Sequence, residues 1–532
     1  MPVEIKVAPP VITISQGRTF MVTDLRGEID PQTDQGVYAI DTRFISSYRL
    51  YINREPWVLD NSSQIAFYSS RAYLTNPKIN TIDGDIEANT IGLTLDRTVD
   101  EGIHEDFYID NYTGKKVRLF LQLELRSDFA DIFEVKAKHV VPRGRILHEI
   151  RFGELAHFHV IPHTPYYGTA DATILYLLVL SETFRWTGDI NLLKKFRKAA
   201  EACLDWIDHY GDLDGDGFQE YKTYSSLGYE NVGWKDAWDA VVYPDGTLVP
   251  QPKALCELQD YVYDAKVRMA EIFEVLGDPA RAQALLQQAE TLKQKFNAVF
   301  WMEVEGCFAY GLDPQKKLIT TIASNAGHCL WSGIADPDKG KRTARRLIQD
   351  DMWSGWGIRT ITSKNPAYNP FSYHLGSVWP HDNSIISAGI KRYEPPDEAN
   401  VVIHSVLDAA RRFEAYRLPE VYAGVKRKGA DDFPALYPPG ANIPQGWAAA
   451  SIFQMLQTIL GLRADAPHKR LYVHPTLPRW LEDLEFQHLR VGPCFFTLHF
   501  WREGDLSRWE VVDMMLNPGV PYEEAIEVVD EP

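Results

Sequence analysis

The spacing of apolar residues changes near Gly168 in this chain of 532 residues, and that change limits the folds open to it. From Val11 to about Val135, short runs such as Val11-Ile12-Thr13-Ile14 alternate apolar and polar residues between Gly, Asn and Asp turns. A period of two is typical of strands, so this part is predicted to be a β-sandwich. Beyond Gly168 the apolar residues are spaced by three and four, which predicts helices with one buried face.

The helices are predicted to come in antiparallel pairs. Gly277 ends one of them, and Asp278-Pro279 supplies the cap and first turn of the next. Short connections alternate with long loops rich in Trp and Asp, which is the pattern of an α/α toroid whose long loops line its mouth. After Pro467 the strand period returns, so a small C-terminal β appendage is expected. Nine helices are predicted, over residues 169–187, 189–209, 251–277, 278–300, 322–334, 336–349, 380–392, 396–414 and 444–461.

Charge and aromatic content limit the possible partners. The formal net charge of -18 and the pI near 5.3 argue against nucleic acid or an anionic membrane, since both require a cationic surface. A neutral polymer would not be repelled. The 14 Trp, 26 Tyr and 24 Phe suit a carbohydrate ligand, although large cores use aromatic residues too.

The five cysteines are scattered and have no C-x-x-C spacing, which argues against a disulfide framework or a zinc site. Residues Met1-Pro2-Val3-Glu4-Ile5-Lys6 do not read as the start of a signal peptide, and no run of about 18 apolar residues occurs. We therefore expect a reduced, cytoplasmic protein. The oligomeric state stays open.

The segment 231–239 sets Asp236 and Asp239 three residues apart among tryptophans in a turn-rich region. Tryptophan faces pack against the C–H faces of sugar rings. Apolar walls also raise the pKa of a neighbouring carboxyl, as a general acid at neutral pH requires. The same residues also fit a buried aromatic loop whose aspartates cap neighbouring backbone.

A second carboxyl, Glu420, follows a proline turn in another predicted long loop. Two carboxyls from different long loops of one toroid can face each other across its mouth. One then protonates a glycosidic oxygen while the other activates water. Taken without Asp236, Glu420 would better fit a surface glutamate after a turn.

Several motifs together resemble those of the prokaryotic glycogen-debranching, amylo-α-1,6-glucosidase-like family. The resemblance covers nearly the whole chain. The motifs are 41–44 and 128–135 in the β-rich part, and 163–173, 211–218, 231–236, 324–328, 373–382, 418–420 and 445–450 in the helical part.

This resemblance implies an (α/α)6 barrel that hydrolyses α-1,6 branch linkages of glycogen-type glucans with inversion and without a cofactor. By motif, Asp236 is the general acid and Glu420 the general base, with carboxyls roughly 6.5–9.5 Å apart. The implied glucose subsite consists of Tyr167, Asp171, Trp234, Lys235, His374, Trp379, His381 and Asp382. His374 and His381 also fit hydrogen-bonded histidines at a helix start, and Trp447 fits either the pocket or the core.

The segment Asp212-Leu213-Asp214-Gly215-Asp216-Gly217 matches the first half of a calcium loop. An EF-hand requires a bidentate glutamate at position twelve, where this chain has Thr223, so that motif is rejected. Glu220 leaves a different calcium geometry open beside a plain Asx turn. No metal is predicted.

The chain departs from the family pattern before Ile146. Relatives carry a long segment there that includes the first barrel helices, so three of twelve helices are expected to be missing. The predicted domains are a truncated β-rich domain over 1–145, an α/α-barrel catalytic domain over 146–465, and a C-terminal β segment over 466–532.

Three functional interpretations follow from this departure. They are a working glucosidase, a decayed or incompletely recorded enzyme, and a catalytically silent glucan-binding relative. Because toroidal enzymes with an Asp/Glu pair also cleave trehalose and oligosaccharides, the linkage preference stays open.

Overall fold

The computed structural model describes residues 10–17, 19–31, 33–39, 42–81, 84–100, 102–127, 144–149, 166–223, 228–437 and 440–531. The chain divides into two compact units, Met1–Val141 and Pro142–Pro532. Within the described ranges, no helix is both long enough and apolar enough to cross a membrane. The motif at 128–135, and parts of those at 41–44 and 163–173, lie outside the described residues. The missing segment before Ile146 therefore stays a prediction.

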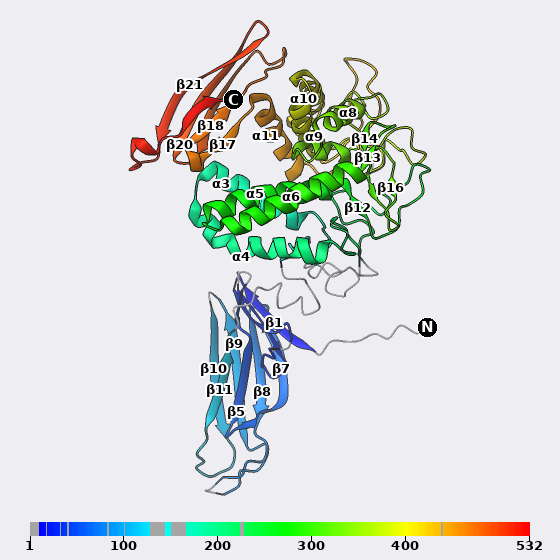
Figure 1. The fold of residues 1–532 in the computed structure, drawn as a ribbon. Helices are drawn as coiled ribbons and strands as arrows, with labels where there is room; N and C mark the ends of the chain where they lie inside the picture. The colour runs from blue at the N-terminus through cyan, green and yellow to red at the C-terminus, as the bar shows by residue number, and fades with distance from the viewer. Residues whose placement is uncertain are drawn as a thin grey trace. The chain divides into compact units, whose positions relative to one another are not determined.

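The first unit is the predicted β-sandwich. Its sheets have the strand orders β1-β2-β3-β4, β10-β9-β8-β7 and β11-β5-β6, and every pairing is antiparallel (Figure 1). β9 alternates buried and partly exposed residues, so Ile91, Leu93 and Leu95 enter the core together with Ile14 of β1. The strands are β1 Val11–Gln16, β2 Thr19–Asp24, β3 Gly36–Ala39, β4 Thr42–Ile45, β5 Ser47–Ile52, β6 Glu55–Pro56, β7 Val58–Ala66, β8 Ser69–Thr75, β9 Ile91–Val99, β10 Ile103–Asn111 and β11 Leu121–Arg126.

The second unit contains nine α-helices among its described residues, each close to a predicted range. α4 continues into one π-helical turn, Ile207–Gly211, and short strand pairs connect some of the later helices. The helices are α3 Ala172–Thr187, α4 Ile190–Trp206, α5 Cys256–Val275, α6 Pro279–Val299, α7 Asn325–Trp331, α8 Pro337–Leu347, α9 Pro380–Tyr393, α10 Pro396–Ala410 and α11 Gly446–Leu460.

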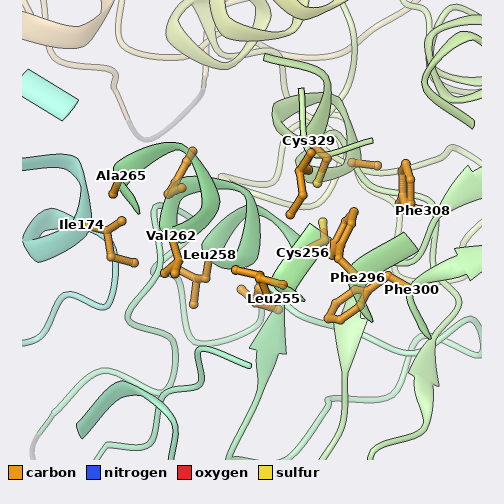
Figure 2. Close-up of a cluster of buried hydrophobic side chains, with 14 of the residues drawn as sticks. Ile174, Leu255, Cys256, Leu258, Val262, Ala265, Phe296, Phe300, Phe308 and Cys329 are labelled. Carbon is orange, nitrogen blue, oxygen red and sulfur yellow. The ribbon is translucent and has the colours of Figure 1, made fainter. Parts of the chain in front are cut away.

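These helices form two layers. α3, α5, α7, α9 and α11 contact one another in succession, and α4, α6, α8 and α10 each pack on one or two of them. The sequence explains the layers, because α5 is buried on most sides whereas α6 buries one stripe that includes Leu285, Leu292 and Phe296. Figure 2 shows Leu258 of α5 and Phe296 of α6 in one apolar cluster. The paired arrangement is that of the predicted α/α toroid.

The C-terminal strands pack against α3, the first of the inner helices. α3 contacts the 3₁₀ turn Ala466–His468 together with strands β17 and β19, and the Gly492 amide donates to the Trp186 carbonyl at 2.8 Å. Figure 1 shows these strands in orange and red beside α11. Two apolar side chains on the first and last inner helices are exposed among the described residues: Val179 of α3 at 63% and Phe453 of α11 at 69%. The strands are β17 Arg463–Asp465, β18 Arg470–Val473, β19 Asp483–Val491, β20 Cys494–Glu503, β21 Leu506–Leu516 and β22 Glu527–Asp530.

Candidate active site

The segment that carries Asp236 is fixed by a buried asparagine. Asn231 is 1% exposed, and its side-chain amide donates to the carbonyls of Ala237 at 2.7 Å and Trp238 at 3.3 Å. The Asn231 Oδ1 accepts from the Tyr221 hydroxyl at 3.0 Å and from the Lys253 ammonium at 2.6 Å. Two hydrogen bonds from Asn231 therefore hold the backbone directly after Asp236, and two more hold the Asn231 side chain in place.

Asp236 has the electrostatic character of an acid that stays protonated up to about pH 6. Burial is the main cause that raises the pKa of its carboxyl to about 6; the charge of His148 opposes the rise, and the charges of Asp171 and Glu420 add to it. These four groups therefore lie near one another. The charge of the predicted base acts on the predicted acid.

Glu420 is held by donors on both carboxylate oxygens. The Tyr373 hydroxyl donates to Oε1 at 2.7 Å, and the Asn442 side chain donates to Oε2 at 3.0 Å. Burial raises the pKa of Tyr373, and the carboxylates of Glu420 and Asp236 raise it further, so this hydroxyl stays protonated and lies near both acids. These donors fix the orientation of the Glu420 carboxylate, as a general base requires.

An aromatic wall adjoins the two carboxyls. Trp234 meets His374, Trp379 and His381 edge to face, with ring centroids 5.7, 5.7 and 4.8 Å away. Trp447 is 47% exposed and tilts against His381 at 4.3 Å, so it lines this wall at its solvent side. The wall consists of four predicted subsite residues and Trp447.

Three nitrogens on this wall are buried, and no hydrogen-bond partner is found for them among the described residues: Trp234 Nε1, His374 Nε2 and His381 Nδ1. Burial lowers the pKa of His381 to about 3 and that of His374 well below its usual value, so both rings are neutral. A buried polar atom without a partner calls for water or a ligand. The wall therefore has three nitrogens whose hydrogen-bonding capacity a water or a sugar hydroxyl can fill.

Two predicted subsite residues lie behind Trp234 and reach no solvent. The Lys235 ammonium donates to the Thr360 carbonyl at 2.7 Å, lies 4.9 Å from the Trp234 ring, and has a pKa that burial lowers to about 8. Asp382 is 0% exposed and bonds His328 Nε2 at 2.7 Å. Burial opposes ionisation of Asp382, but the His328 hydrogen bond and the Lys235 charge outweigh it and lower the pKa.

His328 connects this buried pair to the wall. Its ring stacks on Trp234 at 5.9 Å with an interplanar angle of 7°, and its Nδ1 contacts the Tyr261 hydroxyl. In this conformation Lys235 and Asp382 contact Trp234 and His328, and so position the wall from behind without lining it.

The remaining two predicted residues lie at the start of α3. Asp171 is 9% exposed and accepts a hydrogen bond from Thr169, and burial raises the pKa of its carboxyl. Tyr167 is partly buried. Its neighbour Tyr166 accepts a hydrogen bond from the Tyr229 amide at 2.9 Å, and Asp236 contributes to the raised pKa of Tyr166.

Sequence reasoning did not single out several residues of the site. Tyr373 begins the motif at 373–382, of which only other residues are predicted to line the subsite. Asn442 comes just before the motif at 445–450. His328 ended the motif at 324–328 without an assigned role. His148 carried no local signal, because only the fold brings it to Asp236.

The calcium-like loop is an Asx turn that contains an internal cation. Asp212 accepts from the amides of Gly215 and Gly217 at 2.8 Å each. The Lys316 ammonium lies 3.0 Å from Asp214 and 2.9 Å from Asp216, and it also pairs with Glu220. Although the three aspartates are close enough to hold an ion, Lys316 already supplies the positive charge.

Loss of this lysine should destabilise the fold. Lys316→Met leaves Asp214, Asp216 and the buried Glu220 without their counter-ion, so we expect the free energy of unfolding to fall by about 1–3 kcal/mol. Thermal denaturation with and without a chelator checks this, using the exposed neighbour in Lys317→Met as the control. A chelator should not change the melting temperature of the unmodified protein. A chelator-sensitive transition would show that a metal, and not Lys316, organises the loop.

Comparisons with known proteins agree with this geometry. The family described as "N-terminal domain of (some) glycogen debranching enzymes" matches residues 14–160. The family described as "Mannosylglycerate hydrolase MGH1-like glycoside hydrolase domain" matches residues 183–431. The second range contains both Asp236 and Glu420. The class that these domains and the paired helices define is a glycoside hydrolase. More specifically, the two matches together support a debranching-enzyme-like family. No curated protein matches the chain.

Solved structures resemble the chain at low identity. A sialidase is 12% identical with a TM-score of 0.50, over 65% of this chain and 31% of its own. Neutral trehalase Nth1 from Saccharomyces cerevisiae is 15% identical with a TM-score of 0.33, over 42% of this chain and 41% of its own. An uncharacterized conserved protein from Thermus thermophilus is 13% identical with a TM-score of 0.40, over 53% of this chain and 77% of its own. The chain thus spans less than half of the sialidase or the trehalase.

Proposed function

We propose that this chain is an inverting amylo-α-1,6-glucosidase-like hydrolase that releases glucose from the branch linkages of glycogen-type glucans. The observation that carries the proposal is the unequal carboxyl pair. Burial raises the pKa of Asp236 to about 6, whereas Glu420 accepts hydrogen bonds from Tyr373 and Asn442. A buried acid of raised pKa and a second, firmly held carboxyl are the two groups that hydrolysis of a glycosidic bond requires. The two family matches support the glycosidase class.

The proposed reaction assigns one step to each carboxyl. Asp236 gives its proton to the glycosidic oxygen as the C1–O bond breaks, and Glu420 takes a proton from the water that attacks C1 from the opposite face. Tyr373 orients Glu420, and the aromatic wall with neutral His374 and His381 holds the glucosyl ring. An α-linked substrate then gives β-glucose. We further propose the cytoplasm as the location, since all five cysteines are free thiols.

The test is glucose release from limit dextrin by the full chain, with proton NMR of the first-formed anomer. β-Glucose is expected, and Asp236→Asn and Glu420→Gln serve as inactive controls. α-Glucose would establish retention, and the proposed mechanism would then be wrong. Binding of the dextrin without any glucose release would favour the alternative of a catalytically silent or truncated relative. Trehalose and isomaltose as parallel substrates determine the linkage preference.

The pH dependence should follow Asp236. Because the general acid acts only when protonated, kcat/KM is expected to fall about tenfold per pH unit above about pH 6, where the carboxyl ionises. A pH–rate profile at constant ionic strength measures this decline. An activity that stays level up to pH 8 would rule out Asp236 as the acid of the free enzyme.

A further inference from the structure

A cavity lies beside the segment that carries Asp236. It has a volume of about 450 Å³ and is lined by Ala237, Trp238, Asp239, Asn369, Ser372, Tyr373 and Tyr437. This volume is in the range of small-ligand sites. Tyr373 takes part in both the catalytic site and the cavity. Its hydroxyl donates a hydrogen bond to Glu420, and the residue also lines the cavity. The cavity therefore neighbours the catalytic site, with Tyr373 between them.

Trp238 is exposed but lies on a fixed backbone. Its side chain is 68% exposed, although its carbonyl and that of Ala237 both accept from the buried Asn231 amide. The Ala237 amide also donates to His374 at 3.3 Å. A large indole held on an ordered backbone loses little conformational freedom when a ligand covers it. This arrangement suits a stacking platform.

Polar groups surround the platform. Tyr437 lies 5.3 Å from the Tyr373 ring between centroids, and the charges of Asp239 and Glu420 both act on its hydroxyl. Among the described residues, no hydrogen bond to the Asp239 carboxylate is found. Asn369 is exposed and uses its Oδ1 to accept from the Phe371 amide. An indole face beside a free carboxylate and an amide is a typical carbohydrate-binding surface.

We infer that this cavity binds the glucan on the leaving-group side of the scissile bond, with Trp238 as the stacking platform and Asp239 as a hydroxyl acceptor. The inference rests on the proposed glucosidase function. The rings around Trp234 are largely buried whereas Trp238 is 68% exposed, so Trp238 can cover a long glucan and the inner wall cannot. Ala237, the residue after Asp236, lines the cavity, so the cavity begins next to the acid that protonates the leaving oxygen. These two observations support Trp238 as the contact of the departing chain.

Two substrates with different leaving groups test this inference. Panose or a longer isomalto-oligosaccharide would cover Trp238, whereas the fluoride of α-glucosyl fluoride leaves the cavity empty. Trp238→Ala is expected to lower kcat/KM roughly tenfold or more on the oligosaccharide and to leave the fluoride rate within about twofold. Trp238→Phe should recover much of the loss, because it restores an aromatic face. Trp480→Ala, which removes an exposed tryptophan of the C-terminal region, should change neither rate.

Each other result decides against the inference. Equal rates for Trp238→Ala and the unmodified protein on both substrates would overturn it. An equal loss on both substrates would show that Trp238 acts on Asp236 and not on the leaving group. If the unmodified protein hydrolyses neither substrate, the proposed function fails. Calorimetric binding of the oligosaccharide then tests the cavity alone, and equal affinities of the unmodified protein and Trp238→Ala would reject it.

Discussion

Asp236→Asn is expected to lower the hydrolysis of glucosidic substrates by about 10²–10⁴-fold while leaving most of the activity on α-glucosyl fluoride. A glucosidic oxygen is a poor leaving group that needs the proton of Asp236. Fluoride departs without protonation, so the loss should be confined to the acid-dependent bond. Initial rates on isomaltose and α-glucosyl fluoride measure the two values. Asp245→Asn, in an exposed turn, is the matched control.

The same variant should be more stable at neutral pH. The folded pKa of Asp236 is raised from 3.8 to about 6, so its stabilising contribution is complete below pH 3.8 and is lost as the pH rises through about 6. Asparagine cannot ionise, so we expect a gain of about 1–2 kcal/mol at pH 7.5, after allowance for partial exposure, and none near pH 4. Thermal unfolding at the two pH values checks this. A loss of stability at pH 7.5 would mean that Asp236 is held as a structural anion.

Glu420→Ala is expected to abolish hydrolysis of both substrate types, by about 10³-fold or more, because even an activated leaving group needs a deprotonated nucleophile. Added azide should restore turnover of α-glucosyl fluoride and form β-glucosyl azide, since azide needs no base. Product analysis by NMR identifies the anomer. A retained α-configuration would instead mean that another carboxylate forms the covalent glucosyl intermediate and that Glu420 acts only as its acid/base.

Two companion variants make the Glu420 experiment sharper. Tyr373→Phe removes the 2.7 Å hydrogen bond to Glu420 and should reduce both rates by about tenfold while keeping the base. Glu414→Gln replaces an exposed glutamate near the same loop and should leave both rates unchanged. A Tyr373→Phe variant with full activity would show that Asn442 alone orients Glu420.

The helices were predictable because their signals are local. Gly277 followed by Asp278-Pro279 marks the junction of α5 and α6 without any knowledge of the fold, and the apolar stripe of α6 indicates which face it buries. α7 is shorter than predicted, because it begins after Ser324 and ends before Gly333, which has a positive φ of 86°. Periodicity finds an element more reliably than it finds the ends.

The site was only partly predictable, because its contacts cross between distant segments. The Trp-rich segment and the turn before Glu420 pointed to the two carboxyls. Nothing local to Lys235 showed that its ammonium would be buried against Thr360, or that Lys316 would enter the acidic loop. Such pairings depend on which loops the toroid brings together, and sequence spacing does not contain that information.

The packing of α3 against the C-terminal strands has a consequence for how the second unit folds. Successive inner helices follow one another in the chain with one outer helix between them, so their contacts join segments that are closer in sequence than α3 and the C-terminal strands. The contact of α3 with β17 and β19 joins residues 172–187 to residues 463–491, and bringing such distant segments together costs loop-closure entropy. This junction should therefore be the last part of the unit to form and the first to open. Amide hydrogen exchange should be faster in β17 than in the interior of α5.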